Sequence, residues 1–316
     1  MQQIVARISP LYQNKPLRRL LQTVWIALIG FFVAVAIISQ WDTIRKIEWN
    51  SERLSFIGPA IEATLCRRLS GGVLWMWIVR LFGKGQDISV RQSLRVYFIS
   101  NLATYIPGTY WFIPGRMVMN NKHGVSALQT GASTLLEQLL IILSGAFVSL
   151  LAVNLVAEQL HFQVESFWWV LFIIVVGLIA IHPRSIHFML NQMARVLKIE
   201  PVSLSLSYGT TLLLLAWALV IWLMGALTLL FLAKAFVPEI PLNQVGTFGA
   251  IFAISWLIGF FTPFAPSGIG VREGIMGLAF VAIGIPTAIT VLLAALSRVL
   301  IIFEDVFWAA VSAVFL

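Results

Sequence analysis

Eight apolar runs occupy most of this 316-residue chain, and a membrane-spanning helix needs roughly 20 such residues. The runs lie near 19–40, 56–82, 92–107, 126–157, 167–182, 208–237, 246–262 and 287–315. Charged residues make up only 11% of the chain, whereas soluble domains carry about 25%. The sequence therefore predicts an all-α polytopic membrane protein, a single transmembrane domain over 1–316 with about 7–8 membrane segments.

The two N-terminal runs, within 19–82, are expected to lie at the periphery of this domain. The first, from Leu20 to Ile38, is longer than the 7–15 apolar residues usual in a signal peptide, so we interpret it as a retained span. The second is interrupted by Arg67 and Arg68. It is either one full span or an interfacial piece followed by a short span.

Loop charges predict the orientation of the chain. Basic residues precede the first run, surround the third and follow the fifth, whereas the loop 158–166 contains Glu158 and Glu165 and no Lys or Arg. The positive-inside rule places the basic loops in the cytoplasm and 158–166 outside. We therefore expect an integral protein of the inner or plasma membrane with a cytoplasmic N-terminus. The same rule accounts for the net charge of +8 without a nucleic-acid partner.

The segment 92–118 does not fit a simple count of crossings. The region between the inside loop at 80–95 and the outside loop at 158–166 must cross an odd number of times, yet it contains two apolar runs. The count is corrected if 92–118 enters the membrane and returns to the same side. Two breaks, Pro107-Gly108 and Pro114-Gly115, favour such a re-entrant segment.

A second broken segment, Phe261 to Gly274 (FTPFAPSGIGVREG), matches the first in pattern. Ile99-Ser100-Asn101-Leu102 resembles Ile254-Ser255-Trp256-Leu257, and each is followed by a break and then an arginine, Arg116 or Arg272. Backbone without regular structure is tolerated at membrane depth only against protein or a wet cavity. Both segments are therefore expected to be re-entrant or broken.

The pattern continues beyond the two arginines. Residues 124–126 (GVS) and 284–286 (GIP) each precede a long apolar run, in which Glu137-Gln138 aligns with Ser297-Arg298. The full match requires a gap of five residues. Three predicted spans separate the two broken segments, so they would enter from opposite faces. Such pairs are typical of inverted-repeat transporters, here with halves of approximately 91–182 and 244–316.

Charged residues in the broken segments are the candidate binding site. A guanidinium suits bidentate contact with phosphate, and exposed amides at a helix start bind anions. The candidate substrate-binding residues are Arg272, Glu273, Arg116, Ser267, Gly268 and Gly270. The alternative is that each arginine anchors to lipid headgroups or pairs with a neighbour, Glu273 in the case of Arg272.

A second set, Glu137, Arg298, Glu304 and Asp305, is predicted to form an intramembrane charge network. Glu137 and Arg298 each lie about 12 residues into a helix, roughly 18 Å deep and near the midplane of a 30 Å core. A pseudo-two-fold axis in the membrane plane would allow them to meet. Their contact would be either a structural ion pair or a gate.

The sequence shows no pattern for a metal or a cofactor. The only cysteine is Cys66, and the four histidines lack the spacing of metal ligands. Ser267-Gly268-Ile269-Gly270 lacks the Lys-Ser/Thr of a phosphate loop, so no nucleotide site is expected. We expect no cofactor, no metal and no catalytic residue.

Several of these blocks resemble the transmembrane, flippase-like domain of the lysylphosphatidylglycerol synthase family. The strongest is Pro266 to Gly274, and the others are residues 105–108 with Arg116, 124–126 with Glu137, and 284–286 with Arg298. The resemblance covers about 91–310. It implies lipid translocation, and the expectation is a stand-alone member without the aminoacyl-transferase domain of larger relatives.

Together these features favour a lipid translocator, not an enzyme. Its expected partner is a membrane lipid with an anionic headgroup, either a glycosylated isoprenoid or an anionic phospholipid. A membrane-embedded lipid-phosphate transferase and a small-solute transporter are the alternatives. The oligomeric state stays open, a homo-oligomer included.

Overall fold

The computed structural model of the protein describes residues 50–83, 87–106, 110–159, 182–196, 206–262 and 265–315, with a few isolated positions besides. The predicted span 19–40 falls almost entirely outside these ranges, as do most of the span 167–182, most of the loop 158–166 and the break Pro107-Gly108.

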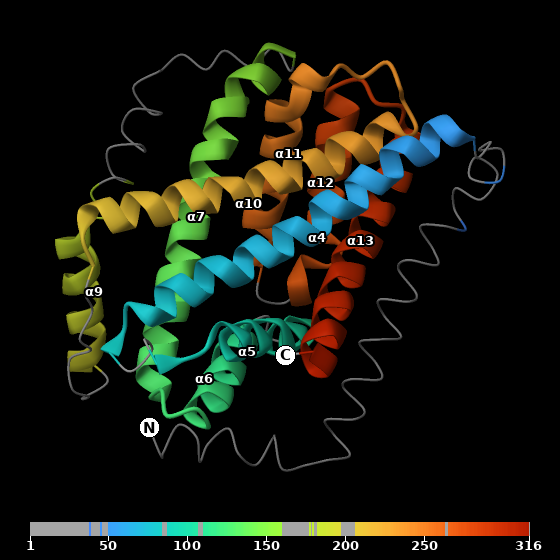
Figure 1. Cartoon of the computed structure of the whole chain (residues 1–316). Coiled ribbons are helices and arrows are strands. Elements are labelled where there is room, and N and C mark those ends of the chain that lie inside the picture. The colour runs from blue at the N-terminus through green and yellow to red at the C-terminus, as the bar shows by residue number, and fades with distance from the viewer. Residues whose placement is uncertain are drawn as a thin grey trace.

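All the described elements are helical (Figure 1). In chain order the α-helices are α4 (Ser51–Arg80), α5 (Val90–Asn101), α6 (Phe112–Asn121), α7 (Ala127–Gln159), α9 (Pro183–Val196), α10 (Tyr208–Lys234), α11 (Val245–Phe260), α12 (Val271–Ala282) and α13 (Thr287–Phe315). The short 3-10 helices are η2 (Leu102–Tyr105), η3 (Leu242–Gln244) and η4 (Pro266–Gly268).

Four helical stretches in the described part of the chain are long and apolar enough to cross a membrane. They are Ala127–Leu150, Tyr208–Lys234, Leu242–Phe260 and Thr287–Phe315. Helix α4 is also long, with 30 residues, but it contains the pair Arg67 and Arg68. It runs without interruption through both arginines, so the second apolar run forms one helix and not an interfacial piece with a separate short span.

The apolar run 92–107 does not form one spanning helix. Helix α5 has 12 residues, about 18 Å at 1.5 Å per residue, which is less than the hydrocarbon core of a bilayer. It begins at a capping box in which Ser89 and Gln92 bond each other's backbone amides. The chain then passes through η2 to the short helix α6.

Helices α4 and α10 form an antiparallel pair that crosses the front of the molecule in Figure 1. Arg53 Nη1 at the start of α4 donates to the carbonyl of Ala235 just beyond the end of α10. Near the middle, the Trp217 indole donates to the carbonyl of Ser70 at 2.9 Å. This pair holds Arg67 and Arg68 against the other helices.

Two successions of elements resemble each other: α5–η2–α6–α7 and α11–η4–α12–α13. The interval between the first two α-helices is 102–111 in one and 261–270 in the other. The short helices α6 and α12 are both followed by a glycine with positive φ, Gly124 at 81° and Gly284 at 84°. The flanking hydrogen bonds also match, Val125 N to Asn120 O and Ile285 N to Phe280 O.

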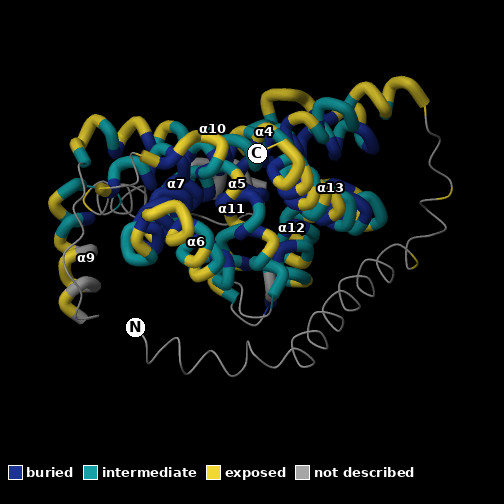
Figure 2. Tube along the Cα trace, turned by 60° about the horizontal axis from the view of Figure 1, so that its bottom comes forward, coloured by how far each residue is buried: buried dark blue, intermediate teal, exposed yellow. Residues whose placement is uncertain are grey.

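Helix α13 buries its charged side chains while some of its large apolar side chains are exposed. Arg298, Glu304 and Asp305 are buried, whereas Phe303 and Val306 are exposed. A helix of a soluble protein shows the opposite arrangement. Figure 2 shows the same alternation of buried and exposed positions along α13. An apolar exterior around a charged interior is the arrangement that a lipid environment favours.

Candidate functional site: a charged cavity among the helices

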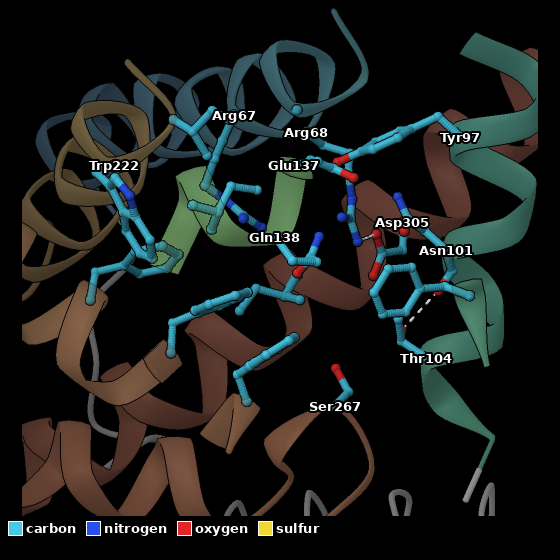
Figure 3. A pocket seen from close by; sticks show the side chains of 18 of the residues that line it. Arg67, Arg68, Tyr97, Asn101, Thr104, Glu137, Gln138, Trp222, Ser267 and Asp305 are labelled. Carbon is cyan, nitrogen blue, oxygen red and sulfur yellow. Dashed lines mark hydrogen bonds and ion pairs between the residues drawn. The ribbon is translucent and has the colours of Figure 1, made fainter. Parts of the chain in front are cut away.

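A cavity of about 120 Å³ lies where α4, α5, α7, α10, α11 and α13 converge (Figure 3). Its floor and walls combine aromatic rings with polar side chains. The polar residues that line it are Arg67, Arg68, Tyr97, Asn101, Thr104, Arg116, Glu137, Gln138, Ser267, Arg272 and Asp305. This volume is below the roughly 300–1,000 Å³ of pockets that hold a drug-sized ligand, so it suits a small polar group.

Two adjacent arginines on α4 face two adjacent carboxylates on α13. Arg67 pairs with Glu304, and Arg68 pairs with Asp305. Arg68 Nε also lies 3.9 Å from Glu304 Oε1, and the Tyr105 hydroxyl donates to Asp305 Oδ2 at 2.7 Å. Removing one partner of a buried pair leaves an uncompensated charge, which typically costs 3–5 kcal/mol. These contacts therefore fasten α4 to α13 beside the cavity.

Arg116 is fully engaged by its surroundings. It is 1% exposed, pairs with Glu137, and its Nε and Nη2 donate to Ser100 and Asn101 at 3.3 and 3.2 Å. Its guanidinium also lies 4.5 Å from the centre of the Tyr97 ring. Each of its three nitrogens thus has a partner. This arrangement matches the alternative considered for the two arginines, namely that the side chain pairs with a neighbouring residue.

Arg272 differs from the other arginines at the cavity. It is 6% exposed, and within the described part of the chain it forms no ion pair and no hydrogen bond. Its Nε and Nη2 are buried without a partner. The Phe252 ring lies 5.7 Å from its guanidinium and 5.2 Å from that of Arg67. Arg67 and Arg272 therefore both lie near the ring of Phe252, and of these two arginines only Arg67 is paired with a carboxylate, that of Glu304.

Two glycines make room for the stem of Arg272. A Cβ added to Gly259 would lie 2.4 Å from Arg272 Cγ, and one added to Gly268 would lie 2.8 Å from the same atom. Real Cβ atoms essentially never approach so closely. Gly268 also has a φ of 70°. The predicted site residue Gly268 therefore positions Arg272 through its lack of a side chain.

The remaining predicted residues of the second broken segment form the start of α12. Glu273 Oε2 accepts from the amide of Gly270 at 2.7 Å, and its other oxygen lies 3.6 Å from Arg298 Nη1. The Ser267 carbonyl accepts from the same Arg298 nitrogen at 3.0 Å. Ser267 has a φ of 51°, a conformation that costs a non-glycine residue about 1–3 kcal/mol and is often found at functional sites.

The charges around the cavity do not balance. Among the described residues, five arginines (Arg67, Arg68, Arg116, Arg272 and Arg298) lie in or beside the cavity with four carboxylates (Glu137, Glu273, Glu304 and Asp305), and four ion pairs use all four carboxylates. One positive charge, on Arg272, is left over. A buried ion without a partner costs several kcal/mol, so the arrangement favours an anion at this point.

The predicted contact between Glu137 and Arg298 is wrong. Glu137 pairs with Arg116 on the neighbouring α6, and Arg298 contacts Glu273 and Ser267 on the loop before α12 and its first turn. The prediction used only the depth of the two residues in the membrane. Each side chain also points in a particular direction around its helix axis, and these directions give the two residues different partners.

The predicted match of Arg116 with Arg272 also changes. Arg116 contacts Glu137, 21 positions further on, and Ser297 Oγ lies 3.4 Å from Met276 Sδ, again 21 positions apart. By this spacing Met276, and not Arg272, lies where Arg116 lies in the first succession, and Ser297 lies where Glu137 lies. With this alignment no gap is needed between the short and the long helix.

Arg67 and Arg68 are site residues that the sequence analysis noted only as an interruption. A signal was available, because a basic pair inside one apolar run and the acidic pair Glu304-Asp305 inside another are suited to each other. Among the described residues no group of three or more His, Cys, Asp or Glu side chains is arranged to hold a metal ion.

These features define an integral membrane protein whose helices enclose a charged cavity. A family model agrees with that class and is more specific. The chain belongs to the family of the lysylphosphatidylglycerol synthase TM region, whose model matches residues 23–304. The comparison with curated proteins finds no match, and the comparison with solved structures finds none.

Proposed function

We propose that this protein moves a lipid with an anionic headgroup between the two leaflets, and that the headgroup binds at Arg272. The observation that carries the proposal is the leftover positive charge, a buried guanidinium whose Nε and Nη2 have no partner. Phosphate oxygens accept such N–H groups in bidentate geometry. The volume of about 120 Å³ suits a phosphate with its substituents better than a whole lipid.

The paired helix successions support transport over simple binding. Transporters often consist of two repeats with broken helices that meet near the midplane. Here we infer that α5–η2–α6 and α11–η4–α12 enter from opposite faces and meet at the cavity. The Tyr110 hydroxyl, next to the first break, donates to the carbonyl of Phe260 at the second, which is consistent with that meeting. Alternating exposure of the cavity would carry the headgroup across.

The transferase alternative has less support from the geometry. Transfer to or from a lipid phosphate usually requires a general base or a bound metal. Each of the four carboxylates near the cavity contacts an arginine. A carboxylate held by a guanidinium is a weak base, so a transport role accounts for these residues with fewer assumptions.

Reconstitution tests the proposal. Vesicles of phosphatidylcholine containing the protein and a trace of fluorescent phosphatidylglycerol are treated with dithionite, which quenches only the outer leaflet. Charge-assisted hydrogen bonds contribute about 1.5–3 kcal/mol, so Arg272→Ala is expected to slow exchange of the probe roughly 10- to 100-fold. Arg272→Lys keeps the charge but loses the planar guanidinium that can make two parallel hydrogen bonds. Its exchange rate should therefore lie between those of the wild type and Arg272→Ala.

Arg53→Ala is the matched control. Arg53 also lies close to a phenylalanine ring, 5.8 Å from that of Phe236, but it is at the outer end of α4 and away from the cavity. Its variant should exchange the probe at the wild-type rate. Equal exchange by wild type and Arg272→Ala would remove Arg272 from the mechanism. Equal rates for phosphatidylglycerol and phosphatidylcholine probes would show that the protein does not recognise the anionic headgroup.

A further inference from the structure

A second hollow, almost entirely apolar, lies between α12 and α13. Its volume is about 440 Å³, within the range of ligand pockets and well above that of the charged cavity. We call it the α12–α13 groove. Its apolar lining includes Gly274, Gly277, Leu278 and Val281 from α12 and Val291 and Ala295 from α13.

Glycines keep this groove open. A Cβ added to Gly270 or Gly274 would meet no other atom within 4 Å, and one added to Gly277 would lie 3.6 Å from Thr290 Cγ2. The neighbouring helix therefore does not fill the space beside them. Leu278 and Val281, at its side, are 71% and 47% exposed. In a protein of this class such a surface faces hydrocarbon.

The polar end of the groove is next to the charged cavity. Glu273 and Arg298 line the groove, while Ser267 and Arg272, which both precede Glu273 within six positions of the chain, line the cavity. Arg298 is 3% exposed, and its Nε and Nη2 are buried without a partner. Arg298, a residue of the groove lining, thus has two N–H groups without a partner among the described residues, and an apolar occupant alone would leave them unbonded.

We infer that the α12–α13 groove binds a hydrocarbon chain of the same lipid whose headgroup binds at Arg272, with oxygen atoms of its linker region at Arg298. This inference rests on the proposed function and adds how the rest of the lipid is held. An amphipathic ligand matches the two hollows, since one is small and charged and the other is larger and apolar. The Glu273–Arg298 pair marks the boundary between them.

A helix of a second copy of the chain is the competing occupant. Glycines four positions apart, such as Gly270 and Gly274, allow close helix packing in membranes. A packed apolar helix, however, would offer no acceptor to the free Arg298 nitrogens, whose burial without a partner is costly. Ester or phosphate oxygens of a lipid would satisfy them. The chemistry at the polar end therefore favours a lipid.

Photolabelling tests the inference directly. The probe is phosphatidylglycerol with a diazirine in the middle of one acyl chain, in phosphatidylcholine vesicles that contain the full-length protein. Labelled peptides from α12 and α13 are quantified by mass spectrometry. Gly274→Leu places a side chain in the empty space of the groove and should lower this labelling at least five-fold. Excess unlabelled phosphatidylglycerol should lower it in the wild type.

Gly58→Leu is the matched control, because Gly58 is also a helical glycine with nothing within 4 Å of an added Cβ and lies on α4, outside the groove. It should leave the labelling of α12 and α13 unchanged. Labelling that neither Gly274→Leu nor the competitor reduces would represent general contact with the bilayer and would overturn the inference. So would a dimer, measured by mass photometry, that Gly274→Leu dissociates.

The two proposals fail in different ways. If Arg272→Ala stops exchange of the fluorescent lipid while the wild-type groove is not labelled, the transport function stands and the groove inference is wrong. If the groove is labelled in a saturable manner but the wild-type protein exchanges no lipid, the groove binds a chain and the transport function is wrong.

Discussion

The guanidinium of Arg116 pairs with the carboxylate of Glu137 at the place where, in the second succession of helices, the sulfur of Met276 meets the hydroxyl of Ser297. Both contacts join a short helix to the long helix that follows it, across the same 21 positions. One backbone arrangement is therefore filled with an ion pair in the first succession and with a neutral contact in the second.

This relationship predicts that the protein tolerates a double substitution at Arg116 and Glu137 better than the loss of Glu137 alone. Glu137→Ala leaves Arg116 buried and unpaired, and it should destabilise the protein by about 3–5 kcal/mol. The double variant Arg116→Met with Glu137→Ser copies the neutral contact and should lose less than Glu137→Ala alone. Thermal unfolding in detergent measures both. If the unfolding temperature of the double variant falls by the sum of the decreases caused by Arg116→Met and by Glu137→Ser alone, the two contacts are not equivalent.

Glu304 should be essential for stability. It is completely buried and faces both arginines of α4, so Glu304→Gln removes one of the two carboxylate charges that compensate them and leaves Arg67 without its partner. The expected loss is about 3–5 kcal/mol, seen as a lower unfolding temperature and less folded protein. Glu62→Gln is the control, because Glu62 is exposed on the same α4 helix and should change stability by less than about 0.5 kcal/mol. Similar unfolding temperatures for the two variants would show that the α4–α13 pairs contribute little.

Gly259→Ala should act through Arg272. The new methyl group would overlap the stem of Arg272, so we expect a lower unfolding temperature and weaker lipid exchange. Adding Arg272→Ala removes the overlap and should restore most of the stability, although not the exchange. Gly58→Ala provides a helical glycine with free space around it and should be neutral or slightly stabilising. If the second substitution does not recover stability, the overlap is not the cause.

Gly124 and Gly284 should respond alike to substitution. Both have φ near 80°, and a Cβ added to either meets nothing within 4 Å, so only the backbone conformation opposes a side chain. Alanine at either site should cost about 1–2 kcal/mol, the usual penalty of a left-handed residue. Unfolding temperatures of the two variants provide the comparison. A large difference between them would mean that the two turns are not equivalent in the folded protein.

The sequence predicted the helices well where the signal is local. Long apolar runs became α7, α10 and α13, and the chain leaves the α-helix between Phe260 and Val271, because length, apolarity and helix-breaking residues act within a few turns. The predicted break at Pro114-Gly115 is wrong, since both residues lie in the first turn of α6, where proline is tolerated. Helix α4 was left open by the sequence because of its two arginines. Their cost is offset by carboxylates on α13, more than 230 positions away, and no local pattern contains that information.

The sequence named some of the residues that line the cavity but not their pairing. Arg272, Arg116, Glu137 and Asp305 all line the cavity, yet Glu137 was matched to Arg298 and Arg116 to Arg272. Both errors have the same physical origin. Depth in the membrane can be counted along a sequence, but a partner also depends on the direction in which each helix presents its side chains and on how neighbouring helices are rotated.

The glycines on either side of Arg272 determine how its charge can move. Its stem runs close to the backbones of Gly259 and Gly268, which restricts the rotamers that Cγ and Cδ can adopt. A lysine or arginine on an open helix face can follow a ligand over several ångströms by changing rotamers, whereas the packed stem of Arg272 has less room to do so. Under the proposed function, a headgroup bound at Arg272 would therefore move mainly together with the backbone of α12 and of the end of α11.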